Sequence, residues 1–123
     1  MIVIDANIWI DHIRHANPHL GDLLRADRAN IHPYTIGEVG LGSLARRSEV
    51  IEQLGQIPGT PIAEHQEVMA FIGLNGLAGT GVGYVDCHLL TTALLQGGSV
   101  WTNDKRLAAQ ARRLAIEYTP EKS

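Results

Sequence analysis

The run Ile2-Val3-Ile4 is the feature that most constrains how this chain can fold. Three β-branched apolar residues in a row predict a strand that is buried on both faces, because no position alternates toward solvent. Strands of this kind occur in parallel sheets whose two faces are covered by helices. The run is followed at once by Asp5, so the predicted strand delivers a carboxylate at its C-terminal end.

The rest of the chain alternates between helix and strand patterns. Asn17-Pro18 has the form of an N-cap followed by proline at the first helical position, and Gly97-Gly98 has the form of a helix C-cap. We predict helices over residues 18–28, 35–45, 49–54, 64–77, 84–96 and 105–115, and short strands over 31–34, 60–63, 99–102 and 116–118. This alternation predicts an α/β fold with a mostly parallel sheet.

Length, charge and cysteine content narrow the classes of function. The 123 residues suit one domain, spanning 1–123. The single cysteine, Cys87, excludes an intrachain disulfide and fits a reducing cytosol. The sequence shows no signal-peptide pattern and no apolar run near the ~20 residues that span a membrane, so we expect a cytoplasmic protein without membrane contact. The net charge of −3 excludes a basic nucleic-acid-binding tail.

Four acidic residues fall at the predicted ends of these elements. Asp5 and Asp104 each follow a strand, and Glu38 and Asp86 each lie in the first turn of a helix. Sites in parallel α/β sheets form outside the carboxyl ends of the strands, so these four side chains can converge there. Such a cluster needs protons or cations to offset its repulsion, and hard divalent ions prefer oxygen ligands. The pattern indicates metal-assisted chemistry on phosphate esters.

Each acid also has a purely structural explanation when it is taken alone. Asp5 and Asp104 can cap helices, with the first helix starting near Asn7. Glu38 can close a capping box with Thr35, and Asp86 can complement a helix dipole. His12, His15 and His19 have a spacing that suggests metal binding, but Asn17-Pro18 interrupts any single helix there and no cysteine accompanies them, so a zinc site is disfavoured.

Four segments together resemble the PIN-domain family, and within it the VapC-type toxins of toxin–antitoxin pairs. They are Ile4-Asp5-Ala6-Asn7, Thr35-Ile36-Gly37-Glu38, Gly83-Tyr84-Val85-Asp86-Cys87-His88-Leu89-Leu90 and Val100-Trp101-Thr102-Asn103-Asp104-Lys105. The resemblance covers essentially the whole chain. It implies a three-layer α/β/α sandwich with a mostly parallel central sheet, and an endoribonuclease that depends on Mg²⁺ or Mn²⁺.

The resemblance also implies roles for individual residues. The acidic, metal-binding site would be formed by Asp5, Glu38, Asp86 and Asp104, with Asn7 and Thr102 as polar residues that orient an acid or a water. Many relatives carry a further acid two residues after the position of Asp104, where this chain has Arg106. The basic residues expected to contact the RNA phosphates are Lys105, Arg106 and Arg14.

The implied partners are an RNA substrate, a second copy of the chain in a homodimer, and a cognate antitoxin that inserts a basic side chain among the acids. Two alternatives stay open. A related metal-dependent phosphatase would place a second aspartate where this chain has Asn7. A PIN-like module without catalytic activity would bind RNA or protein and have no need of four acids.

Overall fold

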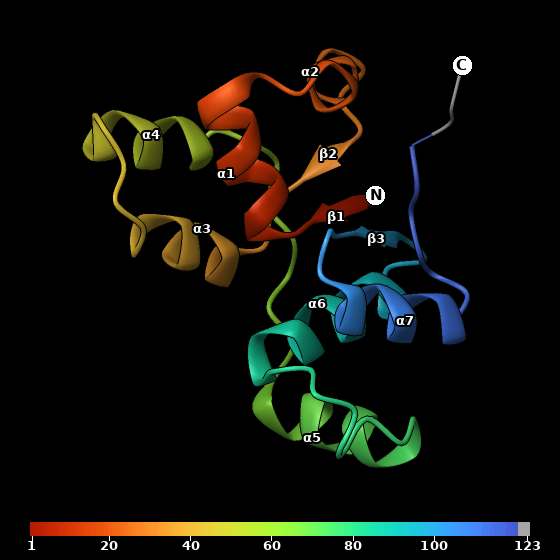
Figure 1. Cartoon of the computed structure of the whole chain (residues 1–123). Coiled ribbons are helices and arrows are strands. Elements are labelled where there is room, and N and C mark those ends of the chain that lie inside the picture. The colour runs from red at the N-terminus through yellow and green to blue at the C-terminus, as the bar shows by residue number, and fades with distance from the viewer. Residues whose placement is uncertain (121–123) are drawn as a thin grey trace.

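The structure is a computed structural model that describes residues 1–120 of the chain. Within this range, short parallel strands alternate with helices (Figure 1). The elements, in chain order, are β1 (Ile2–Ile4), α1 (Ala6–His15), α2 (Pro18–Arg25), β2 (Ala29–Asn30), α3 (Pro33–Gly40), α4 (Arg47–Leu54), α5 (His65–Leu74), α6 (Tyr84–Leu95), β3 (Ser99–Trp101) and α7 (Lys105–Arg113).

The sheet is parallel throughout, with the strand order β2-β1-β3. The N-terminal strand is therefore central: Ile2 is paired with Ala29 on one side and with Ser99 on the other. Isolated parallel bridges, Ile31 to Gly59 and Val100 to Glu117, extend the pairing beyond the two outer strands. The predicted α/β fold with a parallel sheet is confirmed.

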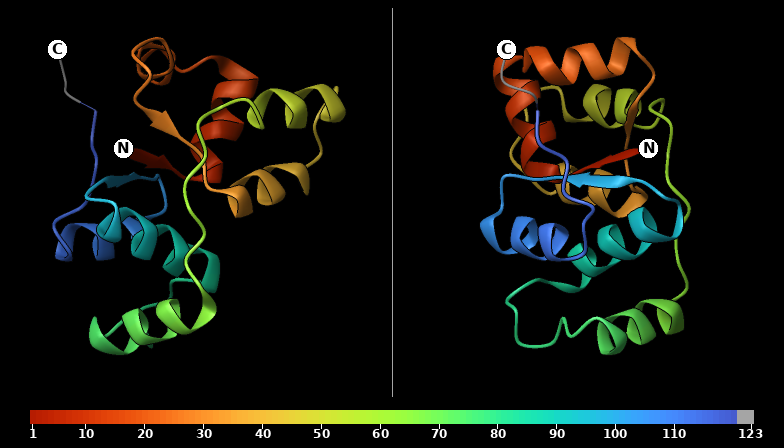
Figure 2. Two further views of the ribbon diagram at one scale, coloured as in Figure 1. Left: turned by 180° about the vertical axis from the view of Figure 1, so that it is seen from behind. Right: turned by 90° about the vertical axis from the view of Figure 1, so that its right-hand side faces the viewer.

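Helices cover both faces of this sheet. Ile2 and Ile4 belong to a core with residues of α1 to α4, whereas Val3 belongs to a second core with residues of α5 to α7. In the ribbon views α1, α2 and α4 lie on one side of the strands and α5, α6 and α7 on the other (Figures 1 and 2). The chain is thus a three-layer α/β/α sandwich, as the family resemblance implied.

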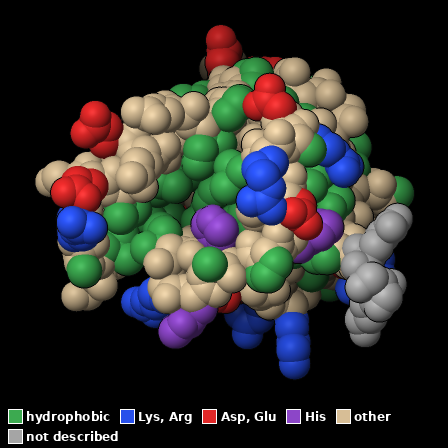
Figure 3. Space-filling model, turned by 90° about the horizontal axis from the view of Figure 1, so that it is seen from above, with side chains coloured by type: hydrophobic (Ala, Val, Ile, Leu, Met, Phe, Trp, Pro, Cys, Tyr) green, Lys and Arg blue, Asp and Glu red, His purple; other side chains and the backbone are tan. Residues whose placement is uncertain are grey.

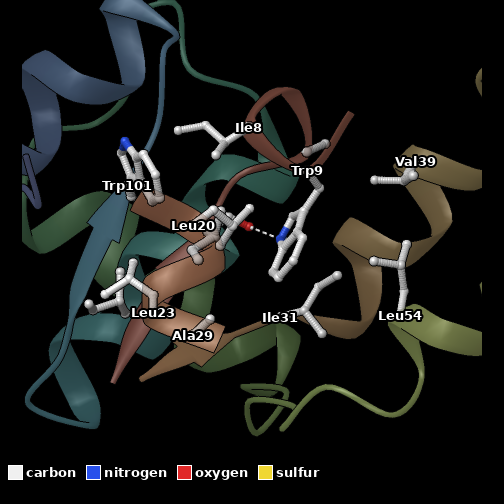
Figure 4. Packing of buried hydrophobic residues seen from close by; sticks show 12 residues of the cluster. Ile8, Trp9, Leu20, Leu23, Ala29, Ile31, Val39, Leu54 and Trp101 are labelled. Carbon is white, nitrogen blue, oxygen red and sulfur yellow. Dashed lines mark hydrogen bonds between the residues drawn. The ribbon is translucent and has the colours of Figure 1, made fainter. Parts of the chain in front are cut away.

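The core on the α1–α4 side is organised around Trp9, which is 1% exposed (Figure 4). Its indole Nε1 donates a hydrogen bond of 3.0 Å to the carbonyl oxygen of Ile4, the last residue of β1. Leu20 and Leu23 of α2 reach the same core from above the sheet. The end of the central strand is therefore anchored by both packing and a buried hydrogen bond.

Three of the predicted strands differ from the structure. β2 ends at Asn30, before the predicted range 31–34, because Pro33 instead occupies the first turn of α3. Residues 60–63 form no strand, and only Gly59 bridges to Ile31. Residues 116–118 contribute a single bridge at Glu117, in which Val100 N donates to Ile116 O and Tyr118 N donates to Val100 O, both at 2.8 Å.

The helix caps predicted at Asn17 and at Gly97-Gly98 are confirmed. The Asn17 side chain accepts a hydrogen bond of 3.0 Å from Leu20 N, with Pro18 in the first turn. Gly97 takes a positive φ of 67° after α6, and Gly98 N donates to Ala93 O at 2.8 Å. A Cβ at Gly98 would lie 2.6 Å from Met1 O, so only glycine fits beside the start of β1. No helix within residues 1–120 is both long enough and apolar enough to cross a membrane.

Candidate active site

Asp5 lies at the carboxyl end of the central strand and is held there by its own backbone and side chain. Its N–H donates to Trp101 O at 2.9 Å, which continues the pairing of β1 with β3 by one residue. The residue is 6% exposed, and its carboxylate Oδ1 accepts from Ala6 N at 2.8 Å while Oδ2 accepts from the Thr102 hydroxyl at 2.7 Å. Asp5 therefore does cap the first helix, and the cap fixes the direction of its carboxylate.

Thr102 connects Asp5 to Asp104. The Thr102 hydroxyl donates to Asp5 and accepts a hydrogen bond of 3.0 Å from Asp104 N. Asp104 caps α7, because its Oδ1 accepts from Arg106 N at 2.9 Å and from Leu107 N at 3.0 Å. One hydroxyl thus sets the relative position of two acidic residues that are far apart in sequence.

Glu38 has a different local role from the one its spacing suggested. The predicted capping box with Thr35 is wrong, because α3 begins at Pro33 and His32 is its N-cap, with Nδ1 accepting from Tyr34 N at 3.0 Å. Glu38 consequently lies in the second turn of α3, away from the helix start. The pKa of its carboxyl is raised by burial first, and further by the negative charges of Asp5 and Asp86.

Asp86 lies in the first turn of α6 and reaches back to the residue before the helix. Its Oδ2 accepts a hydrogen bond of 3.1 Å from Gly83 N. Burial raises the pKa of Asp86, this hydrogen bond opposes the shift, and the charges of Asp5 and Asp104 add to it. The capping contact thus stabilises the carboxylate form only in part.

The charge of Asp5 acts on Glu38 and Asp86, the charge of Asp104 acts on Asp86, and Thr102 bridges Asp5 and Asp104, so we call these four acids the acidic cluster. They come from the end of β1, from α3, from α6 and from the segment after β3, as the sequence predicted. Repulsion among them disfavours the fully charged state, so neutralisation by a proton or a cation would relieve it.

The donor chemistry of the acidic cluster fits a hard divalent cation, because the side chains offer oxygen atoms and no thiolate. Among residues 1–120, no three His, Cys, Asp or Glu side chains already surround one point as a set of ligands. Mg²⁺ typically binds one or two carboxylates and completes its shell with water and phosphate oxygens. The cluster therefore suits an ion that is shared with solvent or substrate.

The remaining predicted site residues lie at different distances from the cluster. Asn7 is exposed in the first turn of α1, and Lys105 and Arg106 are exposed in the first turn of α7. The Arg106 side chain lies against Gly81, since a Cβ added at Gly81 would be 2.8 Å from Arg106 Cδ. Arg14 is nine residues beyond Asp5 on α1, which corresponds to roughly 13 Å along the helix axis. The structure does not bring it to the acids.

Arg14 instead lines a groove of about 660 Å³ between α1, the segment after α3, and α4. Figure 3 views the end of the molecule that these helices form, where hydrophobic side chains are exposed in a hollow among charged ones. The lining combines both kinds of side chain and includes His12, Arg14, Leu44, Arg46, Val50 and Gln53.

The sequence analysis did not assign a role to a group of rings beside the acidic cluster, which we call the ring cluster: His32, Tyr34, His65, Tyr84 and His88. His32 and His88 are 0% and 1% exposed, and neither His32 Nε2 nor His88 Nδ1 has a hydrogen-bond partner within the described residues. Burial, followed by the charge of His88, lowers the pKa of His32 to about 4. The spacing of Tyr84 and His88, four residues apart on one helix, is the sequence signal by which their shared face could have been predicted.

Comparisons with known proteins agree with this geometry. The family model described as "PIN domain" matches residues 2–113. The chain is 39% identical over 124 residues to "Ribonuclease VapC32" of Mycobacterium tuberculosis, in strains CDC 1551 / Oshkosh and ATCC 25618 / H37Rv, and the match covers all of both chains.

Two solved structures share the fold at lower sequence identity. The crystal structure of PAE2754 from Pyrobaculum aerophilum has a TM-score of 0.64 at 19% identity, covering 90% of this chain and 84% of its own. The crystal structure of FitAcB from Neisseria gonorrhoeae has a TM-score of 0.61 at 18% identity, covering 91% and 94%.

Proposed function

The chain belongs to the PIN-domain family, and from that premise we propose that it is a metal-dependent endoribonuclease that hydrolyses RNA phosphodiester bonds as the toxin of a toxin–antitoxin pair. The observation that carries the proposal is the acidic cluster, in which carboxylates from four separate elements lie near the end of the central strand and raise the pKa of Glu38 and Asp86. The full-length similarity to a protein named as a ribonuclease supports the choice of substrate.

The acidic cluster would hold Mg²⁺ or Mn²⁺, with Asp5, Asp86, Asp104 and Glu38 as the available oxygen donors. When bound, the ion would polarise the phosphodiester and lower the pKa of an attacking water. Thr102 keeps the Asp5 carboxylate oriented through its 2.7 Å hydrogen bond. The exposed side chains of Asn7, Lys105 and Arg106 are available to orient water and to contact the flanking phosphates.

The proposal extends to the partners of the protein. We propose that residues 1–123 form one PIN-like nuclease domain. The protein would act in the cytoplasm as a homodimer and would be inhibited by a cognate antitoxin. An arginine of the antitoxin would fit among the acids, because its planar guanidinium pairs bidentately with a carboxylate. The relatives that match over the full length of the chain are named as ribonucleases, which favours neither the phosphatase nor the module without activity.

Cleavage of single-stranded RNA before and after removal of metal tests the enzymatic proposal. We expect cleavage with Mg²⁺ or Mn²⁺, loss of cleavage in excess EDTA, and recovery when the ion is restored. The Asp86→Asn variant should be inactive at all metal concentrations. Cleavage that persists undiminished in EDTA would contradict metal dependence, and phosphorylation of Asp5 by a small phosphodonor would favour the phosphatase instead.

The toxin assignment has a separate test in living cells. Expression of the chain alone should arrest growth, and co-expression of the protein encoded by an adjacent gene should restore it. The Asp86→Asn variant serves as the control and should be harmless. If the wild-type chain is harmless as well, the toxin assignment fails, although the nuclease assignment can still stand on the cleavage assay.

A further inference from the structure

Two tyrosines of the ring cluster, Tyr34 and Tyr84, lie in the first turns of the two helices that carry Glu38 and Asp86. Tyr34 is in the first turn of α3, which carries Glu38, and Tyr84 is the first residue of α6, which carries Asp86. Both side chains are partly open to solvent, with exposed fractions of 40% for Tyr34 and 42% for Tyr84. The reaction proposed above assigns no task to either ring.

Both tyrosine rings pack edge-on against one buried imidazole. The centroid of the His88 ring lies 4.9 Å from that of Tyr34 and 4.8 Å from that of Tyr84. The Tyr34 ring also contacts His32 at 4.9 Å, and the Tyr84 hydroxyl is hydrogen-bonded to His65 Nδ1 at 2.6 Å. Contacts on the inner side of each tyrosine ring therefore fix its orientation, and the outer side of the ring is accessible to solvent.

The two rings also flank the acids along the chain. Tyr34 and Glu38 are four residues apart on α3, a spacing that puts both on one face of the helix. Tyr84 follows Gly83 directly, and Gly83 N donates to the Asp86 carboxylate. Tyr84 lies two residues before Asp86 on α6, so these two side chains do not share a helix face, and Tyr84 is instead joined to Tyr34 through the His88 ring. A strand whose phosphate reaches Glu38 would therefore have Tyr34 beside it, with Tyr84 as the second ring packed on His88.

We propose that Tyr34 and Tyr84 form a stacking platform for an unpaired RNA base next to the phosphodiester that the acidic cluster would cleave. The proposal rests on the proposed function and adds the residues that position the strand. Every base has a π-face that an aromatic side chain can stack on, whatever its sequence. Stacking also needs no positive charge, which suits a chain with a net charge of −3. Rings that are already held by His88 lose little freedom when a base binds.

Binding of an RNA in which single bases have been removed provides the test. The protein would carry Asp5→Asn, so that the strand is not cleaved during the measurement. A short single-stranded RNA is compared with versions that lack one base at each position in turn. We expect one position, or two adjacent ones, at which loss of the base weakens binding by about 10-fold, which is the size expected for one lost stack.

The tyrosine variants then connect that position to the ring cluster. The double change Tyr34→Leu and Tyr84→Leu should weaken binding of the intact RNA by a similar factor and should abolish the difference between intact and base-free strands. Phenylalanine at both positions should preserve the difference. Tyr118→Leu is the matched control, because the Tyr118 hydroxyl is likewise hydrogen-bonded to a histidine, His19, at 2.6 Å but lies by the β3 edge of the sheet.

The possible results separate this proposal from the proposed function. If wild-type protein cleaves RNA but base removal has no effect at any position, the platform is refuted and the nuclease stands. The same holds if the double leucine variant still discriminates, or if it loses antitoxin binding while RNA binding is unchanged. If the protein neither binds nor cleaves RNA, both proposals fail. A double variant that does not fold leaves the decision to the base-removal series and the phenylalanine variant.

Discussion

The residues of β1 and the residue that follows the strand differ in physical character. Ile2, Val3 and Ile4 are buried against apolar side chains on both faces of the sheet, in two cores that share no residue. The next residue, Asp5, is also buried but carries a carboxyl group, and it belongs to the acidic cluster with three other acids. Packing on the two faces of β1 stabilises the folded state, whereas electrostatic repulsion within the acidic cluster destabilises it.

This difference indicates that stability and activity depend on different residues. A substitution in either core should lower the free energy of unfolding and leave the chemistry of the remaining folded protein intact. A neutralising substitution in the acidic cluster should do the reverse. The two regions are adjacent in the sequence. Ile4 belongs to a hydrophobic core, and the next residue, Asp5, belongs to the acidic cluster.

Asp5→Asn should have the largest effect, and it should fall on activity. Asparagine retains a side-chain oxygen that can cap α1 at Ala6 N, but it removes a negative charge from the cluster. We expect cleavage to fall by roughly 10²–10⁴-fold, as for the loss of a catalytic group. The melting temperature without metal should be unchanged or higher, because repulsion is reduced. A variant that melts far below wild type would show that Asp5 is mainly structural.

Trp9→Ala should have the opposite signature. The substitution removes the largest buried side chain of the α1–α4 core together with its hydrogen bond to Ile4 O. We expect the free energy of unfolding to fall by about 3–5 kcal/mol, as measured by urea denaturation. The specific activity of the protein that remains folded should stay near wild type. A loss of activity larger than the loss of folded protein would contradict the separation of the two regions.

The sequence alone predicts those features of the two regions that depend on a local residue pattern. The apolar run at residues 2–4 implied a central strand covered on both faces, and glycine and asparagine marked the helix caps at Asn17 and Gly97. The short strands were harder to predict. The pattern over 31–34 predicts a strand, but Pro33 within it is also well suited to a first helical turn, and His32 supplies the cap. Only the tertiary arrangement decides between these two roles.

The candidate site shows the same limit. Asp5 and Asp104 could be placed from the sequence because parallel strands deliver their C-terminal residues to one edge of the sheet, and Asp86 because it lies in the first turn of a helix. The first-turn position predicted for Glu38 was wrong, since it lies in the second turn of α3. The hydrogen bond from Thr102 to Asp5 and the contact of His88 with both tyrosines join residues that no local pattern connects. The position of Arg14 was also beyond sequence reasoning, because the direction of α1 carries it away from the acids.

Thr102→Val should test the connection between the acids with a smaller effect. Valine has nearly the same shape but cannot donate to Asp5 Oδ2 or accept from Asp104 N. We expect metal affinity and cleavage to fall by about 10- to 100-fold, which is typical for residues that orient metal ligands. Thr102→Ser should retain most activity. Thr91→Val is the matched control, since the Thr91 hydroxyl donates only to Cys87 O within α6 and its loss should affect stability alone.

The pH dependence of stability should reveal the repulsion itself. The folded-state pKa values of Glu38 and Asp86 are raised, so the folded protein binds their protons more tightly than the unfolded chain does. Metal-free protein should therefore lose stability as the pH rises from the ordinary carboxyl pKa through these raised values. Asp86→Asn should flatten this decline, and so should saturating Mg²⁺. A decline of equal steepness in wild type and variant, measured by denaturation across the pH series, would remove the electrostatic explanation.

The smallest expected effect concerns Lys105 and Arg106, at the border between the acidic cluster and the packed α7. Both are exposed in the first turn of that helix, and the Arg106 side chain lies over Gly81, in the loop that leads to Asp86. Contacts to phosphate position a strand without reading its sequence. Replacing both residues by alanine should therefore weaken binding of unrelated RNAs by similar factors. Each lost contact should also reduce the dependence of log affinity on log salt concentration by about 0.7.

Measured on Asp5→Asn protein over a salt series, the double alanine variant should thus show a slope lower by about 1.4 than Asp5→Asn alone. Its metal affinity should equal that of Asp5→Asn alone, because neither Lys105 nor Arg106 offers an oxygen ligand. Arg112→Ala is the matched control at the other end of α7, where Arg112 pairs with Glu117 at 2.9 Å. Its slope should equal that of the unaltered protein. If the double variant keeps the full slope, Lys105 and Arg106 are solvated surface residues, and the groove that contains Arg14 and Arg46 becomes the place to search for the phosphate contacts. In that case the strand would cross the α1–α4 side of the sandwich, and packing and RNA binding would share one layer of the fold.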